Sequence, residues 1–435
     1  MNIHGWGKYP VVDAEMHTPS SNKDFSALFS TTKPSGMTLR GLGRSYGDSS
    51  LGQHMVSSRR LNHFLEFDAA TGRLHCEAGV PLSDILSVFV PKGWFLPVTP
   101  GTQFVTVGGA IASDVHGKNH HVAGCFCEHV AHLDILLDAE RIIRCSPHEH
   151  PDLFHATCGG MGLTGMIISA AIQLKPIKSA FIDQATFKAK NLEESLNLFE
   201  THASAPYSVA WIDCISGGQS LGRSLLMTGN HAADGPLTLS TKNRIGIPFN
   251  MPSELLNRHS IRAFNTLYYH RIRKNAVRSR VHYEPFFYPL DSIDDWNRMY
   301  GKNGFTQYQF AIPKTAGRKA LAAILKTIVA SGKGSFLAVL KAFGKENANL
   351  LSFPMEGYTL ALDFKIEPDM FPLLDRLDAM VLEDGGRIYL TKDARMSPAT
   401  FRIGYRAWEK FQGVRETYGA AGRFRSHQST RLELD

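Results

Sequence analysis

The sequence predicts an α+β fold built from two domains, and three observations support this expectation. The chain has 435 residues, of which 43% are hydrophobic, and this exceeds what one hydrophobic core usually contains. Residues 1–180 show short β-like runs with few helices, whereas residues 181–386 alternate longer helical and strand-like runs. We therefore expect domains at 1–180 and 181–386, and a C-terminal segment, 387–435, that returns to the first domain.

Antiparallel hairpins are expected in the first domain, because β-like runs flank short turns there. A helix is expected after Pro81, where apolar residues recur at helical spacing. Antiparallel pairs of this kind argue against the βαβ alternation of a doubly wound sheet. The strands expected in this domain are Leu61–Phe67, Arg73–Ala78, Val130–Leu137, Arg141–Cys145 and Met166–Leu174.

In the second domain, helical stretches separate the strand-like runs, which predicts an antiparallel sheet with helices on one face. A further strand is expected at Arg387–Thr391, where the C-terminal segment begins. The expected helices are Leu192–His202, Thr315–Ser331 and Phe371–Glu383, and the expected strands are Ser208–Cys214, Phe305–Ile312 and Tyr358–Ile366.

Composition narrows the class of protein. Aromatic residues at 10% and charged residues at 20% exclude a disordered or low-complexity chain. No apolar run approaches the roughly 20 residues of a membrane-spanning helix, and the N-terminal stretch lacks the apolar core of a secretory signal. We expect a cytoplasmic protein.

The cysteines form no CxxC pair, so a disulfide framework is not expected. Cys125 and Cys127 lie near His120, His121 and His129, which raises the question of a zinc site. Their spacing matches no usual structural zinc site and no second cysteine pair follows. We expect no bound metal, and buried thiols instead.

The net charge of +7 comes from one segment, 258–280, which holds seven Arg and Lys residues and no Asp or Glu. One interpretation is a solvated, mobile loop. The other is a flexible cap that attracts an anionic, amphiphilic substrate or touches a membrane surface. No nucleic-acid-binding signature accompanies the charge, so nucleic acid is not expected as a partner. The apolar residues between the charges are Phe264, Leu267, Tyr268, Tyr269 and Ile272.

Three glycine-rich stretches lie in the first domain, at Arg40–Asp48, Pro100–His121 and Cys158–Gly165. Glycines let backbone N–H groups converge on an anion without obstruction by Cβ atoms. Any one stretch alone fits an ordinary tight turn, but three with small hydroxyl neighbours indicate loops that contact a cofactor. The third contains the formal pattern GxGxxG, yet a β-like run follows it where a Rossmann site requires a helix.

Motifs along nearly the whole chain resemble those of PCMH-type FAD-binding proteins of the vanillyl-alcohol-oxidase superfamily. They include GWGKYP, RGLGRSYGDSSL, PGTQFVTVGGAIASDVHGKNHHVAG, DLFHATCGGMGLTGMI and TKDAR. Within that superfamily they are most similar to those of the decaprenylphosphoryl-β-D-ribose 2′-oxidases. The resemblance implies a PCMH-type fold with a substrate-binding (cap) domain and an FAD-dependent oxidoreductase that acts on CH–OH groups.

The resemblance also implies which residues surround FAD. Many relatives attach the flavin covalently through a His in the first loop, where this sequence has Arg44, so we expect non-covalent FAD. A thioether through Cys125 or Cys127 is the alternative. The implied cofactor-binding residues are Gly41, Gly43, Arg44, Ser45, Tyr46, Gly47, Pro100, Gly101, Thr102, Thr106, Gly108, Gly109, Ala112, Ser113, His116, Gly117, Asn119, Gly162, Thr164 and Gly165.

Lys392, Tyr46 and His116 are the catalytic candidates. For Lys392, a desolvated ammonium beside a flavin stabilises both an alkoxide and the anionic reduced ring. Tyr46 offers a phenol above the flavin, and His116 offers a contact to the flavin or the substrate. In the family, the Lys of the TKD motif reaches the flavin and the substrate hydroxyl. Alone, it would be a solvated surface charge. The substrate-binding candidates are Lys341, Gln307, Gln309 and Lys392.

The other site candidates also have alternative interpretations. Lys341 also fits a polar strand end, and Gln307 and Gln309, which share one strand face, also fit a solvent-facing surface. His116 also fits a core histidine. Related mycobacterial-type sequences carry Cys where Ala361 stands, so thiol-directed inactivation is not expected at that point.

The resemblance implies oxidation of a secondary sugar hydroxyl, at C2′ of a polyprenyl-phosphoryl-β-D-ribose. A short-chain NAD(P)H reductase would then reduce the 2′-keto product and complete epimerisation to the arabinose form, an arabinan precursor for the cell wall. The enzyme would be cytoplasmic and peripheral at the inner face of the membrane. Two alternatives remain: an oxygen-using alditol or aldonolactone oxidase of the same superfamily, and a non-enzymatic carbohydrate- or lipid-binding relative.

Overall fold

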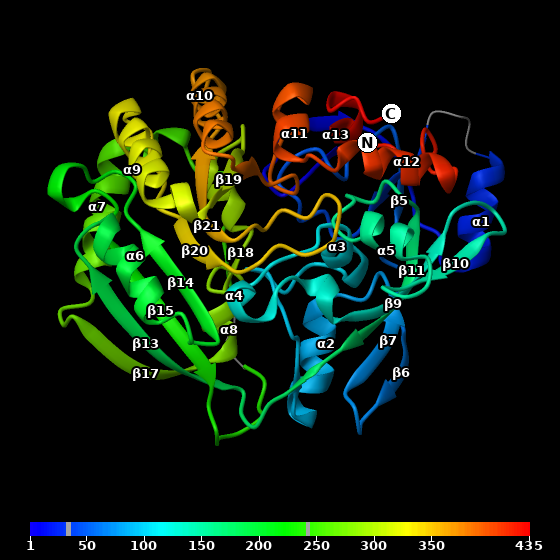
Figure 1. Ribbon diagram of the computed structural model, residues 1–435, viewed down its shortest axis with the longest axis horizontal. Coiled ribbons are helices and arrows are strands. Elements are labelled where there is room, and N and C mark those ends of the chain that lie inside the picture. The colour runs from blue at the N-terminus through cyan, green and yellow to red at the C-terminus, as the bar shows by residue number, and fades with distance from the viewer. Residues whose placement is uncertain (32–35, 241–243) are drawn as a thin grey trace.

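A computed structural model describes residues 1–31, 36–240 and 244–435 and confirms the α+β class. Two antiparallel sheets stand side by side in Figure 1, a five-stranded sheet on the right and an eight-stranded sheet on the left. Long loops join them across the middle of the molecule. Each sheet has its own buried hydrophobic cluster.

The five-stranded sheet has the strand order β10-β9-β11-β7-β6, and all its pairs are antiparallel. Both predicted hairpins are present in it. The predicted helix after Pro81 is α2 (Leu82–Phe89), and its apolar face packs into the core of this sheet. The strands are β6 (Phe64–Asp68), β7 (Arg73–Glu77), β9 (Val130–Leu136), β10 (Ile142–Cys145) and β11 (Met166–Gln173).

The third glycine-rich stretch joins a helix to a strand. Helix α5 (Pro151–Thr157) precedes it and β11 follows it, which is the reverse of the strand–loop–helix order of a Rossmann site. The expectation that this GxGxxG is not a dinucleotide fingerprint is therefore confirmed. The second stretch contains a short helix, α3 (Val107–Ala112), whose N-cap is Thr106.

The eight-stranded sheet has the order β17-β13-β15-β14-β20-β21-β19-β22 and is antiparallel throughout. The three predicted helices cover one face as α6 (Leu192–Thr201), α9 (Lys314–Ser331) and α10 (Met370–Glu383). The strands are β13 (Phe181–Ala189), β14 (Tyr207–Ile212), β15 (Ser224–His231), β17 (Ala276–His282), β19 (Phe305–Pro313), β20 (Ala338–Phe343), β21 (Gly357–Lys365) and β22 (Arg387–Ile388).

Side chains alternate between the two faces of this sheet, as the pleat requires. Those on the helix side form the larger hydrophobic cluster, with Ala210, Leu226, Phe310, Leu340 and Leu360 among them. Their neighbours along the strands point to the opposite face, toward the five-stranded sheet. These are Val209, Met227, Gln309, Val339 and Ala361, and all of them line a cavity.

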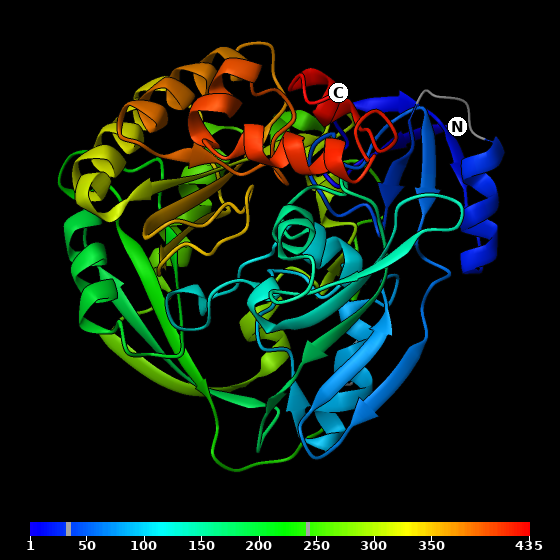
Figure 2. The same cartoon turned by 45° about the vertical axis from the view of Figure 1, so that its right-hand side comes forward.

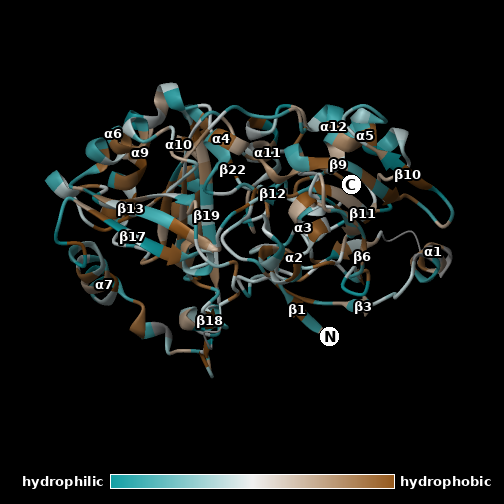
Figure 3. Ribbon diagram, turned by 90° about the horizontal axis from the view of Figure 1, so that it is seen from below, coloured by the Kyte–Doolittle hydropathy of each residue, from teal (hydrophilic) through white to brown (hydrophobic). Residues whose placement is uncertain are grey.

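The basic segment 258–280 is not the loop that its charge suggested. It forms helix α7 (Arg258–His270) and most of the edge strand β17. Asn257 caps the helix by accepting from the backbone N–H groups of His259 and Ser260. In Figure 3, α7 lies on the far side of β13 and β17 from α6, α9 and α10, so it covers the end of the cavity-facing side of the sheet.

The C-terminal segment contacts both sheets. Strand β22 pairs with β19, whereas α12 (Trp408–Thr417) packs on α5. The buried Arg415 guanidinium donates to the carbonyls of Leu163 and Phe424 and so joins the tail to the third glycine stretch. In Figure 2 the C-terminal helices lie across the top of both halves. The boundaries at 180/181 and 386/387 stay a prediction.

The remaining elements are short or peripheral. A parallel three-stranded sheet, β3-β5-β4, lies near the N-terminus. Three further sheets have two strands each, β1-β2, β8-β12 and β16-β18. In the described part of the chain, no helix combines the length and apolar composition needed to cross a lipid bilayer. These strands are β1 (Asn2–His4), β2 (Val11–Asp13), β3 (Glu15–His17), β4 (Thr38–Arg40), β5 (His54–Ser57), β8 (Trp94–Phe95), β12 (Lys175–Pro176), β16 (Ile245–Gly246) and β18 (Ile293–Asp294), and the helices are α1 (Asn22–Thr31), α4 (His120–Ala123), α8 (Tyr283–Phe287), α11 (Pro398–Gly404) and α13 (His427–Arg431).

Candidate active site

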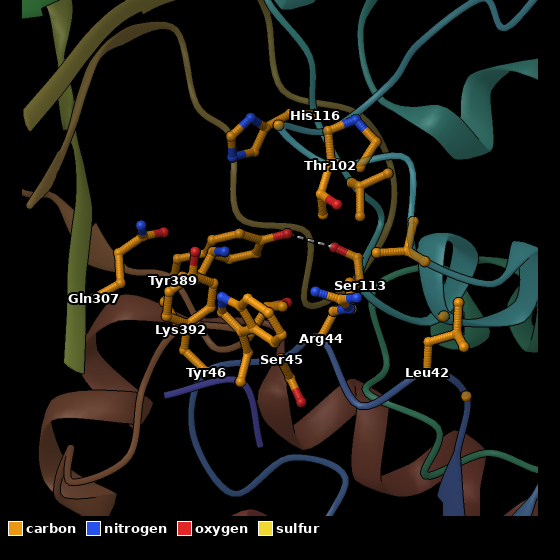
Figure 4. Close-up of a pocket in the computed structure, with 18 of the residues that line it drawn as sticks. Leu42, Arg44, Ser45, Tyr46, Thr102, Ser113, His116, Gln307, Tyr389 and Lys392 are labelled. Carbon is orange, nitrogen blue, oxygen red and sulfur yellow. Dashed lines mark hydrogen bonds between the residues drawn. The ribbon is translucent and has the colours of Figure 1, made fainter. Parts of the chain in front are cut away.

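A cavity of about 390 Å³ separates the two sheets. One wall consists of the three glycine-rich stretches, and the other is the exposed face of β14, β15, β19, β20 and β21. Residues from the N-terminus and from the TKD turn close one side (Figure 4). Residues far apart in the sequence therefore meet at one site.

The first glycine stretch forms an open nest of backbone donors. In the described part of the chain, the backbone N–H groups of residues 42–45 have no protein acceptor. Gly43 adopts a φ of +64°, and a Cβ on Gly41 would lie 2.4 Å from Oγ1 of Thr106. The backbone can turn and approach so closely only without side chains here. Unpaired, converging N–H groups are what an anionic group such as a pyrophosphate requires.

Arg44 points across this nest and is held by aromatic rings. Its guanidinium carbon lies 4.0 Å from the centroid of the Trp6 ring and 5.4 Å from that of Phe104. Burial lowers the pKa of Arg44, and the nearby Asp291 partly offsets this effect. Asp291 accepts from the backbone N–H of Gln103 at 2.9 Å, and burial raises its pKa to about 6.

The second stretch is fixed by its own capping bond and by a tyrosine of the other wall. Thr106 Oγ1 accepts from the backbone N–H of Gly109 at 3.1 Å. Tyr389 donates its hydroxyl to the carbonyl of Ser113 at 3.2 Å, which Figure 4 shows as a dashed line. Tyr389 also stacks on Phe353, with ring centroids 4.4 Å apart. These contacts hold the stretch against the eight-stranded sheet.

Most of the residues expected near FAD line the cavity, but three do not. Gly47 packs against the backbone of the TKD turn, where a Cβ would lie 1.7 Å from the carbonyl oxygen of Asp393. Asn119 donates to the carbonyl of Pro97 at 2.8 Å. Thr164 shares a hydrogen bond of 2.9 Å with Thr157. Each of the three supports a cavity loop from behind.

Lys392 and Tyr46 meet at one end of the cavity. The Lys392 ammonium lies 3.7 Å from the centroid of the Tyr46 ring, and the backbone N–H of Tyr46 donates to the carbonyl of Thr391 at 3.1 Å. Burial lowers the pKa of Lys392, although the negative charge of Asp363 opposes the shift. Burial raises the pKa of Tyr46 well above its usual value, so its hydroxyl stays protonated. The lysine is thus not the solvated charge that its turn alone suggested.

His116 joins the second glycine stretch to the sheet. Its Nε2 lies 3.1 Å from the side-chain amide of Gln309, and its Nδ1 lies 3.4 Å from the ammonium of Lys341. Burial and the positive charge of Lys341 lower the pKa of His116 well below its usual value, so the ring is neutral. Burial also lowers the pKa of Lys341 to about 8. Gln309 and Lys341 are therefore cavity residues, not solvent-facing ones.

Gln307 lies on the same strand face as Gln309, as the alternation predicted, and also lines the cavity. Its amide donates to Oδ1 of the buried Asp363 at 2.5 Å. Asp363 lies behind the cavity wall, where burial raises the pKa of its carboxyl group. The network fixes the amide of Gln307 and leaves its oxygen available to the cavity.

Several cavity residues were not among the sequence candidates. Lys118 and Trp6 lie inside motifs that carry the family resemblance, but nothing in the sequence around them indicates that either side chain binds a ligand. Asp291 ends the stretch FFYPLD, which also carries the family resemblance, and Tyr389 had no signal beyond its residue type. Lys118 donates to the carbonyls of Phe286 and Phe287, and burial lowers its pKa to about 7. The apolar lining on the sheet side of the cavity was also missed, and it consists of Val209, Trp211, Met227 and Val339 on strands, Leu337 just before β20 and Tyr268 of α7.

All six cysteines are buried and free, and none of them lines the cavity. Cys125 lies 3.8 Å from the hydroxyl of Ser352, and Cys127 donates to the carbonyl of Ile111 at 3.5 Å. Both thiols are therefore enclosed by protein.

The glycine-lined nest of backbone donors, the lysine beside it and the antiparallel sheet that faces them fit the class of PCMH-type FAD-dependent oxidoreductases. Residues 17–146 match the family described as FAD binding domain. The chain belongs to the decaprenylphosphoryl-β-D-ribose oxidase family. It is 34% identical over 450 aligned positions to decaprenylphosphoryl-β-D-ribose oxidase of Mycolicibacterium smegmatis, covering 99% of this chain and 97% of that protein.

More distant relatives share only part of the chain. Human Δ(24)-sterol reductase is 27% identical over 39% of this chain and 32% of its own length. The D-arabinono-1,4-lactone oxidase of Yarrowia lipolytica is 25% identical over 36% of this chain and 31% of its own length.

Proposed function

We propose that the protein oxidises the C2′ hydroxyl of a polyprenyl-phosphoryl-β-D-ribose. The observation that carries this proposal is the division of the cavity into two chemically different regions. Lys118, Lys341 and Lys392 place amino groups along one part, whereas Val209 and Trp211 of β14, Met227 of β15 and Val339 of β20 line another part with apolar side chains. An anionic sugar phosphate suits the first region and a polyprenyl chain suits the second.

The cofactor proposed for the cavity is non-covalent FAD, and the donor set fits it. The unpaired N–H groups of residues 42–45, with Gly41 and Gly109, would hold the pyrophosphate, and Gln307 and Tyr46 would border the ring system. FAD, when bound, supplies the acceptor for the hydride from the substrate carbon. Among the described residues of the first glycine stretch that line the cavity, none is an Asp or Glu, so no carboxylate of this stretch opposes a bound pyrophosphate.

The side chains of this protein would bind the substrate and move its hydroxyl proton. The lowered pKa of Lys392 makes its amine a better proton acceptor near neutral pH than an ordinary lysine. Lys341 and Lys118 would pair with the phosphate, and Gln309 and His116 would orient the ribose hydroxyls. The apolar wall excludes water from the reacting carbon.

The direct product would be a 2′-keto sugar, which a separate short-chain NAD(P)H reductase would reduce to the arabinose form. Incubation with polyprenyl-phosphoryl-β-D-ribose and an artificial electron acceptor should give a product that is lighter by two hydrogens. The alternative function is an oxygen-using oxidase of free alditols or aldonolactones, since one distant relative is a lactone oxidase. Hydrogen peroxide formed from those substrates, with the lipid-linked sugar unchanged, would favour it.

Non-covalent binding predicts that acid precipitation releases all the flavin. Arg44 occupies the position where relatives attach FAD, and its guanidinium forms no bond to flavin carbon but stacks on Trp6. Cys125 and Cys127 are buried away from the cavity. Yellow colour should appear in the supernatant, and yellow colour remaining in the protein pellet would refute the proposal.

The proposed phosphate-binding role of Lys341 predicts a loss of activity at high pH. Its ammonium form binds the phosphate, and the fraction in that form decreases above a pKa of about 8. We expect kcat/KM to fall as pH rises above this value. Lys118, whose pKa burial lowers to about 7, is already mostly neutral there. In Lys341→Arg the charge persists, because the pKa of arginine exceeds about 12. An alkaline decrease that is the same in this variant would contradict the assignment.

We also propose that α7 and the loop before it touch an anionic membrane surface. Leu267 and Phe264 of α7 are 75% and 43% exposed, Phe249 of the preceding loop is 62% exposed, and Arg273 and Lys274, which follow α7, are also exposed. Because each basic residue near an anionic surface contributes about 1 kcal/mol, Arg273→Glu with Lys274→Glu should weaken co-sedimentation with phosphatidylserine vesicles at least about tenfold.

The control for vesicle binding is a charge reversal of the same size on the other face of the sheet. Lys314→Glu with Lys319→Glu changes two exposed residues of α9 and should leave vesicle binding as it is. Equal binding by both double variants and the unmodified protein would exclude α7 as the contact.

A further inference from the structure

A cluster of metal-binding residue types lies on the five-stranded sheet, outside the active-site cavity. His75 on β7 and His132 on β9 flank the central strand β11 and are both in register with Ala171. Asp134 lies two residues beyond His132 on the same face of β9, opposite Ser169. Because Ala171 has only a methyl group, the two imidazoles lean toward each other above it, with ring centroids 5.3 Å apart.

The three side chains bring their ligand atoms together. One ring nitrogen of each histidine and one carboxylate oxygen of Asp134 all lie within 4.8 Å of one another. Nε2 of His75 lies 3.7 Å from Oδ2 of Asp134. A tetrahedral zinc site needs metal–ligand distances of about 2.0 Å and thus ligand spacings of about 3.3 Å. Side-chain rotations on fixed strands are enough to close the remaining gap.

The surroundings of the cluster hold the carboxylate and leave one imidazole unpaired. Ser169 donates its hydroxyl to Asp134 at 2.7 Å and contacts Nε2 of His75 at 3.1 Å. Arg144 donates to both oxygens of Asp134, at 2.8 and 3.1 Å, but its side chain is 51% exposed and can leave. Nε2 of His132 is buried and has no hydrogen-bond partner among the described residues.

We propose that His75, His132 and Asp134 bind a divalent transition metal of the zinc type. Two imidazoles and one carboxylate are ligands that Zn²⁺ accepts, and a water would take the fourth position. Ser169 would hydrogen-bond the coordinating carboxylate, as outer-shell hydroxyls commonly do. The site is independent of the proposed oxidation, because none of its residues lines the active-site cavity. Its occupancy would tie together β7, β11 and β9.

A second cluster of the same residue types lies near the N-terminus, and its geometry is poorer. Glu15 lies 3.4 Å from His17 and 3.5 Å from His54, on the three-residue strand β3 and on β5. The Glu15 side chain is 64% exposed, against 16% for Asp134. An exposed carboxylate on a short strand is poorly held for coordination. Zn²⁺ binding by this N-terminal cluster would therefore be a weak background signal, which the experiment below eliminates by mutation.

The test uses flavin-loaded full-length protein, freed of metal by a chelator, and titration with Zn²⁺ by calorimetry. The protein carries His17→Ala so that the N-terminal cluster does not contribute. We expect one Zn²⁺ per chain, and about tenfold or greater weakening in both His75→Ala and His132→Ala. Arg144→Ala should instead bind several-fold more tightly, because it removes a cation that competes for Asp134.

The Arg144→Ala variant keeps the proposal falsifiable even if a histidine variant folds poorly, and the flavin absorbance reports folding in each case. Equal Zn²⁺ affinity in the His75→Ala and His132→Ala variants and their parent would overturn the proposal. Absence of binding up to millimolar Zn²⁺, or weaker binding in Arg144→Ala, would also overturn it.

Discussion

Replacing Lys392 by alanine should lower kcat by about 10²–10⁴-fold while the protein keeps its flavin. The reason is the position of the ammonium, 3.7 Å from the Tyr46 ring centroid at the polar end of the cavity. Partial burial lowers its pKa, so its neutral amine can accept the substrate proton near neutral pH, and alanine supplies no replacement for that amine. Single-turnover flavin reduction measures the loss directly, because it reports the chemical step and not product release.

Two variants make the Lys392 result specific. Lys410→Ala removes an exposed lysine of α12 outside the cavity and should leave the rate unchanged. Lys392→Arg keeps a positive charge but not a base of suitable pKa, so it should remain slow. A Lys392→Ala enzyme that reduces its flavin within about threefold of the normal rate would exclude proton transfer by this residue.

Replacing Gly47 by alanine should destabilise the protein by about 3 kcal/mol or more and empty it of flavin. The added Cβ would lie 1.7 Å from the Asp393 carbonyl oxygen and 2.5 Å from its carbonyl carbon. Both are backbone atoms, so neither can rotate away. Relief of the overlap must separate the first glycine stretch from the turn that carries Lys392.

The comparison for Gly47 is Gly413 on α12, where nothing lies within 4 Å of an added Cβ. Gly413→Ala should fold at least as stably as the unmodified protein, because alanine favours a helix more than glycine does. Thermal unfolding and the flavin-to-protein ratio report both effects. Full flavin content and an unchanged Tm in Gly47→Ala would show that this contact does not hold the site together.

The glycine-rich loops of the site could be predicted from sequence, because the need for glycine at a sharp turn depends only on nearby residues. Gly41 and Gly43 are needed where the chain turns sharply against Thr106 and Arg40, and such a need is visible in a short stretch of sequence. The meeting of His116 with Gln309 and Lys341 could not be predicted in the same way. It depends on how the loop of His116 packs against β19 and β20, and these contacts join residues 193 and 225 positions apart in the sequence.

The basic segment shows a different reason for error. Its charge indicated a loop, yet Ile261, Phe264, Tyr268 and Ile272 recur at helical spacing behind the cap residue Asn257. Tyr268 packs on Trp211 of β14, with ring centroids 4.7 Å apart, and so faces the cavity. The apolar periodicity was the more informative signal, and the charged residues occupy the remaining faces of the helix.

The central claim is that the cavity oxidises a lipid-linked ribose, and anaerobic flavin reduction tests it most directly. The flavin-loaded protein is mixed, without oxygen, with polyprenyl-phosphoryl-β-D-ribose, free pentoses, alditols or aldonolactones, and the flavin absorbance is followed. Bleaching by the polyprenyl-phosphoryl ribose, with little or none by the free sugars, is the predicted result. Bleaching by alditols or lactones alone would contradict the account.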